Sequence, residues 1–127
     1  MSNPVIGVPV VGVPVADQDK AIEFYTEVFG FTTRMDAPLP QLGSRWIVLA
    51  PAGAGAETTG IALIQAHDGL PTGVETGIRL AVADAAAKHA ELTERGVPVG
   101  ELLRWPGTPP MFTATDPDGN GLEIIEQ

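Results

Sequence analysis

Val10-Val11-Gly12-Val13-Pro14-Val15-Ala16-Asp17 leads into Gln-Asp-Lys-Ala-Ile-Glu-Phe-Tyr-Thr-Glu-Val-Phe and then Gly30-Phe31. The same order returns from residue 77 as Gly-Ile-Arg-Leu-Ala-Val-Ala-Asp, followed by an Ala-rich stretch that ends at Gly96. Val15-Ala16-Asp17 recurs as Val82-Ala83-Asp84 at an offset of 67 (82 − 15), and Gly30 recurs as Gly96 at an offset of 66 (96 − 30). A near-constant offset through two types of element predicts a duplicated supersecondary unit.

Each copy has the pattern of a strand followed by a helix. Because side chains alternate between the two faces of a strand, large apolar residues at every second position share one face. We expect a helix to cover that face in each copy and to bury its residues. These are Val11, Val13, Val15, Ile78, Leu80 and Val82.

Helices are predicted at 18–29 and 85–95, where Asp17 and Asp84 suit the N-cap position and Gly30 and Gly96 suit a left-handed C-cap. The remaining strands are predicted from β-rich runs, with a loop at 37–43 that contains two prolines. Their ranges are 5–16, 31–36, 45–50, 60–66, 77–82, 97–104, 111–115 and 121–126.

The order of these elements predicts an α+β fold of two tandem βαβββ modules. The modules span about 5–66 and 76–126, and 67–75 is the linker between them. A chain of 127 residues is the usual size of one domain, so we expect a single domain over 1–127.

Composition excludes several classes of protein. The chain has no cysteine, which excludes disulfides, thiol catalysis and thiolate metal sites. Its net charge of −9 is the wrong sign for binding nucleic acid or an anionic membrane surface. The first basic residue is Lys20, so a signal peptide is not expected, and the apolar opening is too short and too rich in proline to span a bilayer. We expect a soluble cytoplasmic protein.

Two motifs together carry a family resemblance. One is the doubled Val-x-Asp and helix, with Phe24-Tyr25 and Gly30-Phe31 in the first copy, and the other is the closing run Asp116-Pro-Asp-Gly-Asn-Gly-Leu-Glu123. Together they resemble the vicinal oxygen chelate superfamily, which includes glyoxalase I, extradiol dioxygenases, fosfomycin-resistance enzymes and bleomycin-resistance proteins. The resemblance covers residues 5–126. It implies a glyoxalase-like fold, in which curved sheets enclose a cavity, usually in a homodimer, and this fold hosts catalysts and binders alike.

The resemblance also implies where a metal would be held. Metal-dependent members take ligands from the first and last strands of each module, which here correspond to Val10, Ala62, Gly77 and Glu123. Only Glu123 has a donor atom, whereas a catalytic site needs about three protein ligands. We therefore expect no metal and no other cofactor.

Other candidate metal ligands have simpler interpretations. His67 in the linker and His89 in the second helix belong to no cluster, so solvated or capping roles are expected. The run from Asp116 to Gly121 matches the start of an EF-hand loop, but its twelfth position would be Gln127 instead of a bidentate Glu. We predict that this run is a reverse turn.

Ligand-binding residues are expected on the strand faces opposite the helices and at the cavity mouth. Arg79 and Glu123 are the two charges expected there, and two interpretations stay open. They form an ion pair, or Arg79 binds a carboxylate or phenolate while Glu123 accepts a proton. Trp105, next to several prolines, either stacks on a flat ligand or packs across a dimer interface. The predicted ligand-binding residues are Trp46, Arg79, Trp105, Met111, Phe112 and Glu123.

Two functional hypotheses follow. The first is a metal-free binding protein of the bleomycin-resistance type, which sequesters an aromatic or polycyclic natural product or antibiotic in the clefts of a homodimer. It has no catalytic residue. The second is a glyoxalase-like lyase, isomerase or dioxygenase, which has a degenerate metal site or uses Glu123 as a general base. We favour the first, because small and aliphatic residues at the ligand positions enlarge the cavity.

Overall fold

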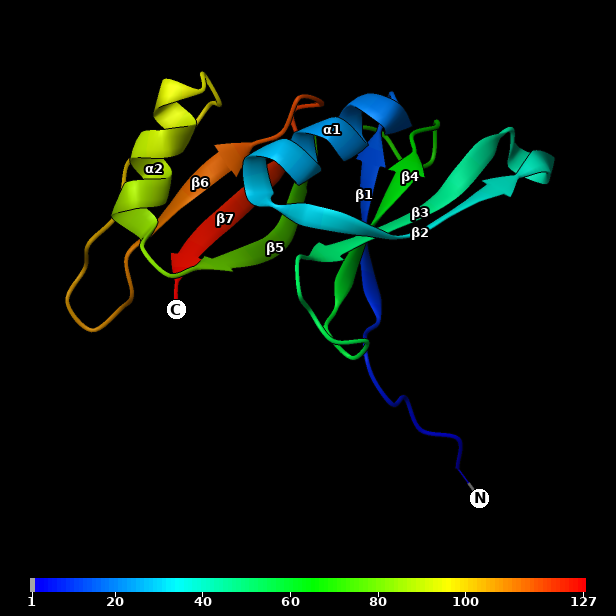
Figure 1. Cartoon of the computed structure of the whole chain (residues 1–127), viewed down its shortest axis with the longest axis horizontal. Coiled ribbons are helices and arrows are strands. Elements are labelled where there is room, and N and C mark those ends of the chain that lie inside the picture. The colour runs from blue at the N-terminus through cyan, green and yellow to red at the C-terminus, as the bar shows by residue number, and fades with distance from the viewer. Residues whose placement is uncertain (1) are drawn as a thin grey trace. The chain divides into compact units, whose positions relative to one another are not determined.

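The computed structural model describes residues 2–127 and has an α+β fold with two mixed sheets. The chain divides into two compact units, unit 1 (Met1–Gln65) and unit 2 (Ala66–Gln127). Figure 1 shows the elements in order. They are β1 (Val10–Val15), α1 (Gln18–Phe29), β2 (Phe31–Leu39), the 3₁₀ helix η1 (Pro40–Leu42), β3 (Ser44–Pro51), β4 (Gly60–Gln65), β5 (Glu75–Val82), α2 (Ala85–Glu94), β6 (Met111–Thr115) and β7 (Gly121–Glu126).

Unit 1 is a four-stranded sheet in the order β1-β4-β3-β2, with β1 parallel to β4 and the other pairs antiparallel. The helix α1 begins where predicted, because the Asp17 carboxylate accepts a hydrogen bond from Lys20 N at 3.1 Å. It ends at Gly30, whose φ of 72° is the left-handed C-cap conformation. Its apolar face packs on the sheet over a core of fully buried side chains. These include Val13, Val15, Tyr25, Ile47, Leu49 and Leu63.

Gln18 joins two strands of unit 1 that diverge. Strands β3 and β4 pair only at Val48–Ala62 and Leu49–Ile61. Beyond these pairs, Gln18 Nε2 donates to Arg45 O at 2.8 Å and to Leu63 O at 2.9 Å, and Gln18 Oε1 accepts from Arg45 N at 3.2 Å. A buried glutamine therefore satisfies the backbone groups that the open ladder leaves without partners.

The hairpin of β2 and β3 is longer than the sequence predicted. The predicted strand ended at 36 and a loop followed, but β2 continues to Leu39 and pairs there with Ser44 of β3. The prolines at 38 and 40 misled this prediction. Since β2 is at the edge of its sheet, a missing N–H at Pro38 does not interrupt the ladder to a second neighbour.

Unit 2 is a three-stranded sheet in the order β5-β7-β6, with β5 parallel to β7 and β6 antiparallel to it. The predicted strand at 97–104 is not formed as such. Its residues make two isolated bridges to the β6 region, Val99 to Ala114 and Leu103 to Met111. Pro98 has no N–H to donate, which limits a continuous ladder in this segment.

The predicted burial of the six apolar strand residues is only partly correct. Val13 and Val15 are fully buried, whereas Val11 and the three residues of β5 are half-buried. The faces are as predicted, because Ile78, Leu80 and Val82 are each less exposed than Gly77, Arg79 and Ala81. Burial is incomplete because α2 packs mainly on β6 and β7, while β5 is at the edge of the sheet.

Candidate functional site

The face of unit 2 that lies away from α2 carries an ion pair between neighbouring strands. Arg79 of β5 is directly opposite Glu123 of β7, and Arg79 Nη2 lies 3.0 Å from Glu123 Oε2. The two side chains are 61% and 33% exposed, so the pair is open to solvent and to a ligand. The first of the two interpretations of these charges is therefore seen in the structure.

A bulge in β5 supports the guanidinium from a second side. Glu75 is opposite Gly121 and Arg79 is opposite Glu123. Between these two pairs β5 advances four residues while β7 advances two, so β5 contains two extra residues. Within the bulge Gly77 has a φ of 74°, and its carbonyl accepts a hydrogen bond from Arg79 Nη1 at 3.0 Å. Sequence reasoning missed this feature because it placed Gly77 at the first position of the predicted strand 77–82. The strand begins at Glu75, and a glycine inside a strand is a known signal for a bulge.

Met111 and Phe112 are on opposite faces of β6. Met111 is opposite Ile125 and is half-buried, and Thr113 is opposite Glu123 on the same face. Phe112 is on the α2 face, is 1% exposed, and its ring lies edge-on to the ring of His89 with 4.9 Å between centroids. The predicted position of Phe112 at the cavity mouth is therefore corrected, because Phe112 belongs to the core of unit 2.

The two histidines make local contacts. His89 Nε2 lies 2.8 Å from the carbonyl oxygen of Gly100, which links α2 to the segment after it. His67 Nδ1 accepts a hydrogen bond from Gly69 N at 3.2 Å within the linker. Both contacts agree with the structural roles expected for these residues.

Trp105 is exposed in a short turn before β6. Its side chain is 59% exposed, and its carbonyl oxygen accepts hydrogen bonds from Thr108 N at 3.2 Å and Thr108 Oγ1 at 3.0 Å. On either side of the turn, Leu103 and Met111 exchange two backbone hydrogen bonds of 2.8 and 3.2 Å. The turn therefore holds the backbone of Trp105 while its indole ring stays accessible.

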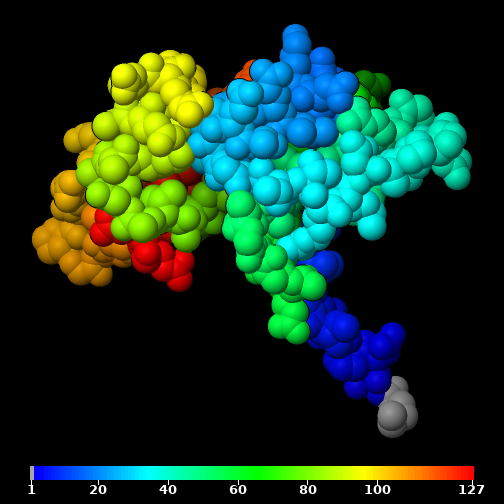
Figure 2. All heavy atoms as spheres, in the orientation of Figure 1, coloured from blue at the N-terminus to red at the C-terminus, as the bar shows by residue number. Residues whose placement is uncertain are grey.

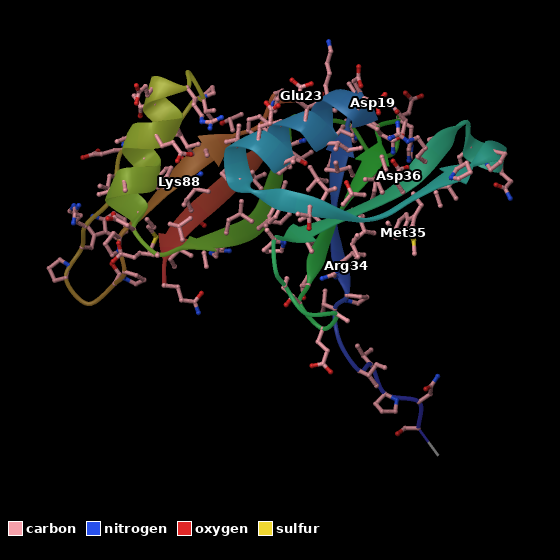
Figure 3. The ribbon with its side chains drawn as sticks, in the orientation of Figure 1. Asp19, Glu23, Arg34, Met35, Asp36 and Lys88 are labelled. Atoms are coloured by element: carbon pink, nitrogen blue, oxygen red, sulfur yellow. The ribbon has the colours of Figure 1, made fainter. Side chains whose placement is uncertain are left out.

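In unit 1, Trp46 is on the sheet face away from α1. It is 36% exposed and is opposite Ala37. Met35, which sequence reasoning missed, is two residues before Ala37 on the same face and is 51% exposed. Figure 3 shows Met35 and Asp36 pointing to opposite faces of β2. The alternation of apolar residues in 35–39 is a signal that would have identified this apolar surface.

Two charged residues of the same hairpin, Asp36 and Arg45, are on the α1 face. Arg45 contacts Asp36 at 2.9 Å and Asp19 of α1 at 2.7 Å. The hydrogen bond from Arg45 lowers the pKa of Asp36, and both carboxylates raise the pKa of Arg45 further above its ordinary value. These charges neutralise one another at the surface and do not face Trp46.

The Asp116–Asn120 turn is formed as predicted. Asp116 Oδ1 accepts hydrogen bonds from Asp118 N and Asn120 N, both at 2.9 Å, and Asp116 Oδ2 accepts from Asn120 Nδ2 at 3.0 Å. Asp116 is 4% exposed and Asn120 is fully buried. The carboxylate therefore organises the turn from inside.

Unit 1 has a cavity of about 580 Å³, and none of the six predicted ligand-binding residues lines it. It is formed where the residues before β1 meet the β3–β4 loop, and Figure 2 shows residues 2–9 projecting from unit 1 as an extended arm. Its lining residues are Ile6, Gly7, Val8, Pro9, Ala56, Glu57 and Thr59. In residues 2–127 the structure has no helix that is long and apolar enough to cross a membrane.

Comparison with known proteins identifies the family. The sequence profile of the Glyoxalase/Bleomycin resistance protein/Dioxygenase superfamily matches residues 7–124. The chain belongs to this superfamily. No match is found among curated proteins.

Three solved structures resemble the chain along nearly its whole length. TnmS3, an antibiotic binding protein from Streptomyces sp. CB03234, is 33% identical with a TM-score of 0.82, and the match covers 98% of each chain. A glyoxalase/bleomycin resistance protein from the same organism is 35% identical over 91% of this chain and 96% of that one, with a TM-score of 0.75. A superfamily member from Sphaerobacter thermophilus DSM 20745 is 32% identical over 97% and 98%, with a TM-score of 0.83.

The residues at the superfamily's metal positions do not fit a resident metal. Val10, Ala62 and Gly77 have no side-chain donor, and Glu123 is engaged by Arg79. Within residues 2–127, the structure contains no group of three or more His, Cys, Asp or Glu side chains that could hold a metal ion. We therefore derive no reaction step through a metal.

Proposed function

We propose that this member of the glyoxalase/bleomycin-resistance superfamily is a metal-free small-molecule-binding protein, which sequesters an aromatic natural product or antibiotic. The observation that carries the proposal is the 33% identity to an antibiotic binding protein over 98% of both chains. The exposed rings of Trp46 and Trp105 support it, because a flat ligand gains both area burial and stacking from such rings.

The donor set supports binding over metal-assisted chemistry. Three of the four positions that correspond to metal ligands carry Val10, Ala62 and Gly77, which have no side-chain donor for a metal. Within unit 2 the ligand-contacting residues would be Arg79, Trp105, Met111 and Glu123, and within unit 1 the candidate is Trp46. Phe112 would act indirectly, by supporting β6 from the core.

We further propose that the two units function as one domain over 1–127, and that the protein is a cytoplasmic homodimer. Light scattering coupled to size exclusion measures the mass directly. A mass near twice 13.2 kDa supports the dimer, and a mass near 13.2 kDa contradicts it.

One observation favours a second candidate, a glyoxalase-like enzyme with Glu123 as a general base. Among residues 2–127, Glu123 Oε1 has no hydrogen-bond partner, and the side chain is open to solvent. Against this, Arg79 Nη2 lies 3.0 Å from the other carboxylate oxygen, so only one oxygen of Glu123 is available to a substrate.

The decisive experiment follows the fate of the ligand. The purified protein is first analysed for zinc, nickel, iron and manganese, and then screened by thermal shift against polycyclic natural products. We expect no stoichiometric metal, saturation at one or two ligands per dimer, and recovery of the ligand unchanged by mass spectrometry. A transformed ligand, with turnover abolished in Glu123→Gln, would establish the enzyme instead.

A further inference from the structure

The guanidinium of Arg79 is held between two acceptors. Nη1 donates to Gly77 O and Nη2 contacts Glu123 Oε2, each at 3.0 Å. A guanidinium has five N–H donors in a rigid plane, so two contacts orient it and leave other donors available. Because the side chain is 61% exposed, a ligand on this face of unit 2 meets donors whose direction is already set.

The bulge that supplies the Gly77 carbonyl is anchored by Thr76 and Asn120. Thr76 Oγ1 donates to Gly121 O at 2.7 Å and accepts from Ile78 N at 3.1 Å, so it spans the bulge. Asn120 Oδ1 accepts hydrogen bonds from the N–H groups of Gly73 and Val74, which fixes the start of β5. The buried turn and the bulge therefore form one continuous hydrogen-bonded structure that ends at Arg79.

Unit 1 has the corresponding strands without the bulge. Gly60 N donates to Pro9 O and Gly121 N donates to Val74 O, each at 2.9 Å. The next corresponding cross-strand pairs are Gly12–Ala62 and Arg79–Glu123. In unit 1 the chain advances three residues from the acceptor Pro9 to the paired residue Gly12 (12 − 9). In unit 2 it advances five residues from the acceptor Val74 to the paired residue Arg79 (79 − 74). Two extra residues in unit 2 supply the carbonyl that holds Arg79.

The charge balance of the pair indicates an uncharged ligand group. Glu123 neutralises Arg79, and residues 66–127 carry ten acidic and four basic side chains, a formal charge of −6 (4 − 10). An anionic ligand group would therefore gain little electrostatic binding free energy next to this negatively charged unit. Arg79 donates hydrogen bonds while the free oxygen of Glu123 accepts them, and a hydroxyl group satisfies both because it accepts and donates.

We propose that the Arg79–Glu123 pair binds a phenolic hydroxyl of an uncharged aromatic ligand, and that Thr76 is a positioning residue that holds Arg79 for this contact through the bulge. This inference rests on the binding function proposed above and specifies the ligand group that the site recognises.

The first test compares three probes of one shape: 2-naphthol, 2-methylnaphthalene and 2-naphthoate. Affinities are measured by NMR titration of the full chain. We expect 2-naphthol to bind about three- to tenfold more tightly than 2-methylnaphthalene, as a hydrogen bond to a partly exposed charged group would give, and 2-naphthoate to bind no more tightly than 2-naphthol. Equal affinities for the first two, or tightest binding of 2-naphthoate, overturns the hydroxyl inference but leaves aromatic binding intact. If no probe binds, the aromatic-binding function itself is contradicted.

The second test asks whether the bulge acts through Arg79. Thr76→Val removes both hydrogen bonds of the hydroxyl at nearly constant shape, and Thr76→Ser keeps them. We expect Thr76→Val and Arg79→Gln to reduce the preference for 2-naphthol over 2-methylnaphthalene to about onefold, while Thr76→Ser retains the preference. In Thr76→Val the affinity for 2-methylnaphthalene should be unchanged.

Gly77→Ala provides an independent disruption of the same bulge. Nothing lies within 4 Å of a Cβ at position 77, so the substitution acts only through the unfavourable φ of 74°. We expect it to reduce the 2-naphthol preference as Thr76→Val does. Retention of the preference in both variants would overturn the positioning role of the bulge, because a purely structural role does not change the ratio of two affinities.

Discussion

The two units have the same parallel pairing of their first and last strands, but the residues that face each other in the middle of that pairing differ. The first-strand residue opposite the closing strand is Gly12 against Ala62 in unit 1 and Arg79 against Glu123 in unit 2. A Cβ on Gly12 would lie 2.7 Å from Ile64 Cδ1, so a side chain there would require the end of the Ile64 side chain to move. In unit 2 both positions carry long charged side chains that reach solvent. The duplication thus retained the pairing, and at this pair of positions only the second copy carries polar side chains.

The largest effect is expected when an aromatic ring is removed from the core of unit 2, which tests the two faces of its sheet. Phe112→Ala should destabilise the protein by about 3–5 kcal/mol, because the ring is 1% exposed and its loss leaves a cavity beneath α2. Urea unfolding followed by circular dichroism measures the change. The matched control is Met111→Ala on the other face of β6, which should cost clearly less because Met111 is half-buried. Equal costs would contradict the assignment of the two faces.

A second prediction exchanges the charge between the units. Ala62→Glu should destabilise the protein by about 3 kcal/mol, because the position is 1% exposed and corresponds to Glu123 without an arginine opposite it. The reverse change, Glu123→Ala, should cost under about 1 kcal/mol, since the pair with Arg79 is largely exposed. Chemical denaturation of both variants gives the comparison. A well-tolerated Ala62→Glu would show that the centre of unit 1 is as open as that of unit 2.

A third prediction concerns the turns that precede the closing strands. Asn120→Ala should cost about 2 kcal/mol, because it removes the acceptor of Gly73 N and Val74 N and a donor to Asp116 from a buried site. The corresponding residue of unit 1 is Thr59, whose hydroxyl makes one exposed hydrogen bond to Val8 O. Thr59→Val should therefore cost less than Asn120→Ala in thermal or urea unfolding. A larger effect at Thr59 would indicate that the unit 1 arm, rather than the unit 2 turn, controls stability.

The smallest expected effect is the pH dependence of the stability that the Asp36–Arg45 contact gives to unit 1. Arg45 lowers the pKa of Asp36 in the folded protein, so their contact stabilises the fold above the ordinary carboxylate pKa near 4. This stabilisation should be lost as the pH falls through the lowered pKa. Comparing Asp36→Asn with the wild type from pH 6 to pH 2.5 checks the sign. The difference in stability should shrink as the solution becomes acidic, and a difference that grows would contradict the assignment.

Much of the architecture followed from local patterns. The caps at Asp17, Gly30 and Asp84, and the alternating valines of β1, were sufficient to place both helices and the faces of the strands. The ion pair of Arg79 and Glu123 was one of two open interpretations. Prolines misled the prediction at the end of β2, because an edge strand tolerates a residue without an N–H.

The sequence of β6 contained a signal that would have separated two of the predicted site residues. Met111 and Phe112 are adjacent in a predicted strand, so they point to opposite faces and cannot both line one surface. The alternation alone does not say which face is the core. That depends on the pairing of Phe112 with Ile124 and on the packing of α2 over both.

By itself the sequence determined the duplication, the α+β class, the two capped helices and the apolar faces of the first strands, because these depend on interactions between residues close in the chain. Only the tertiary structure decided which residue supports Arg79. The bulge inserts two residues into β5, and since side chains repeat every two residues in a strand, it leaves the apolar face unchanged. The hydrophobic pattern is therefore the same with or without the bulge. Contacts from Thr76 and Asn120 to groups more than 40 residues away select it.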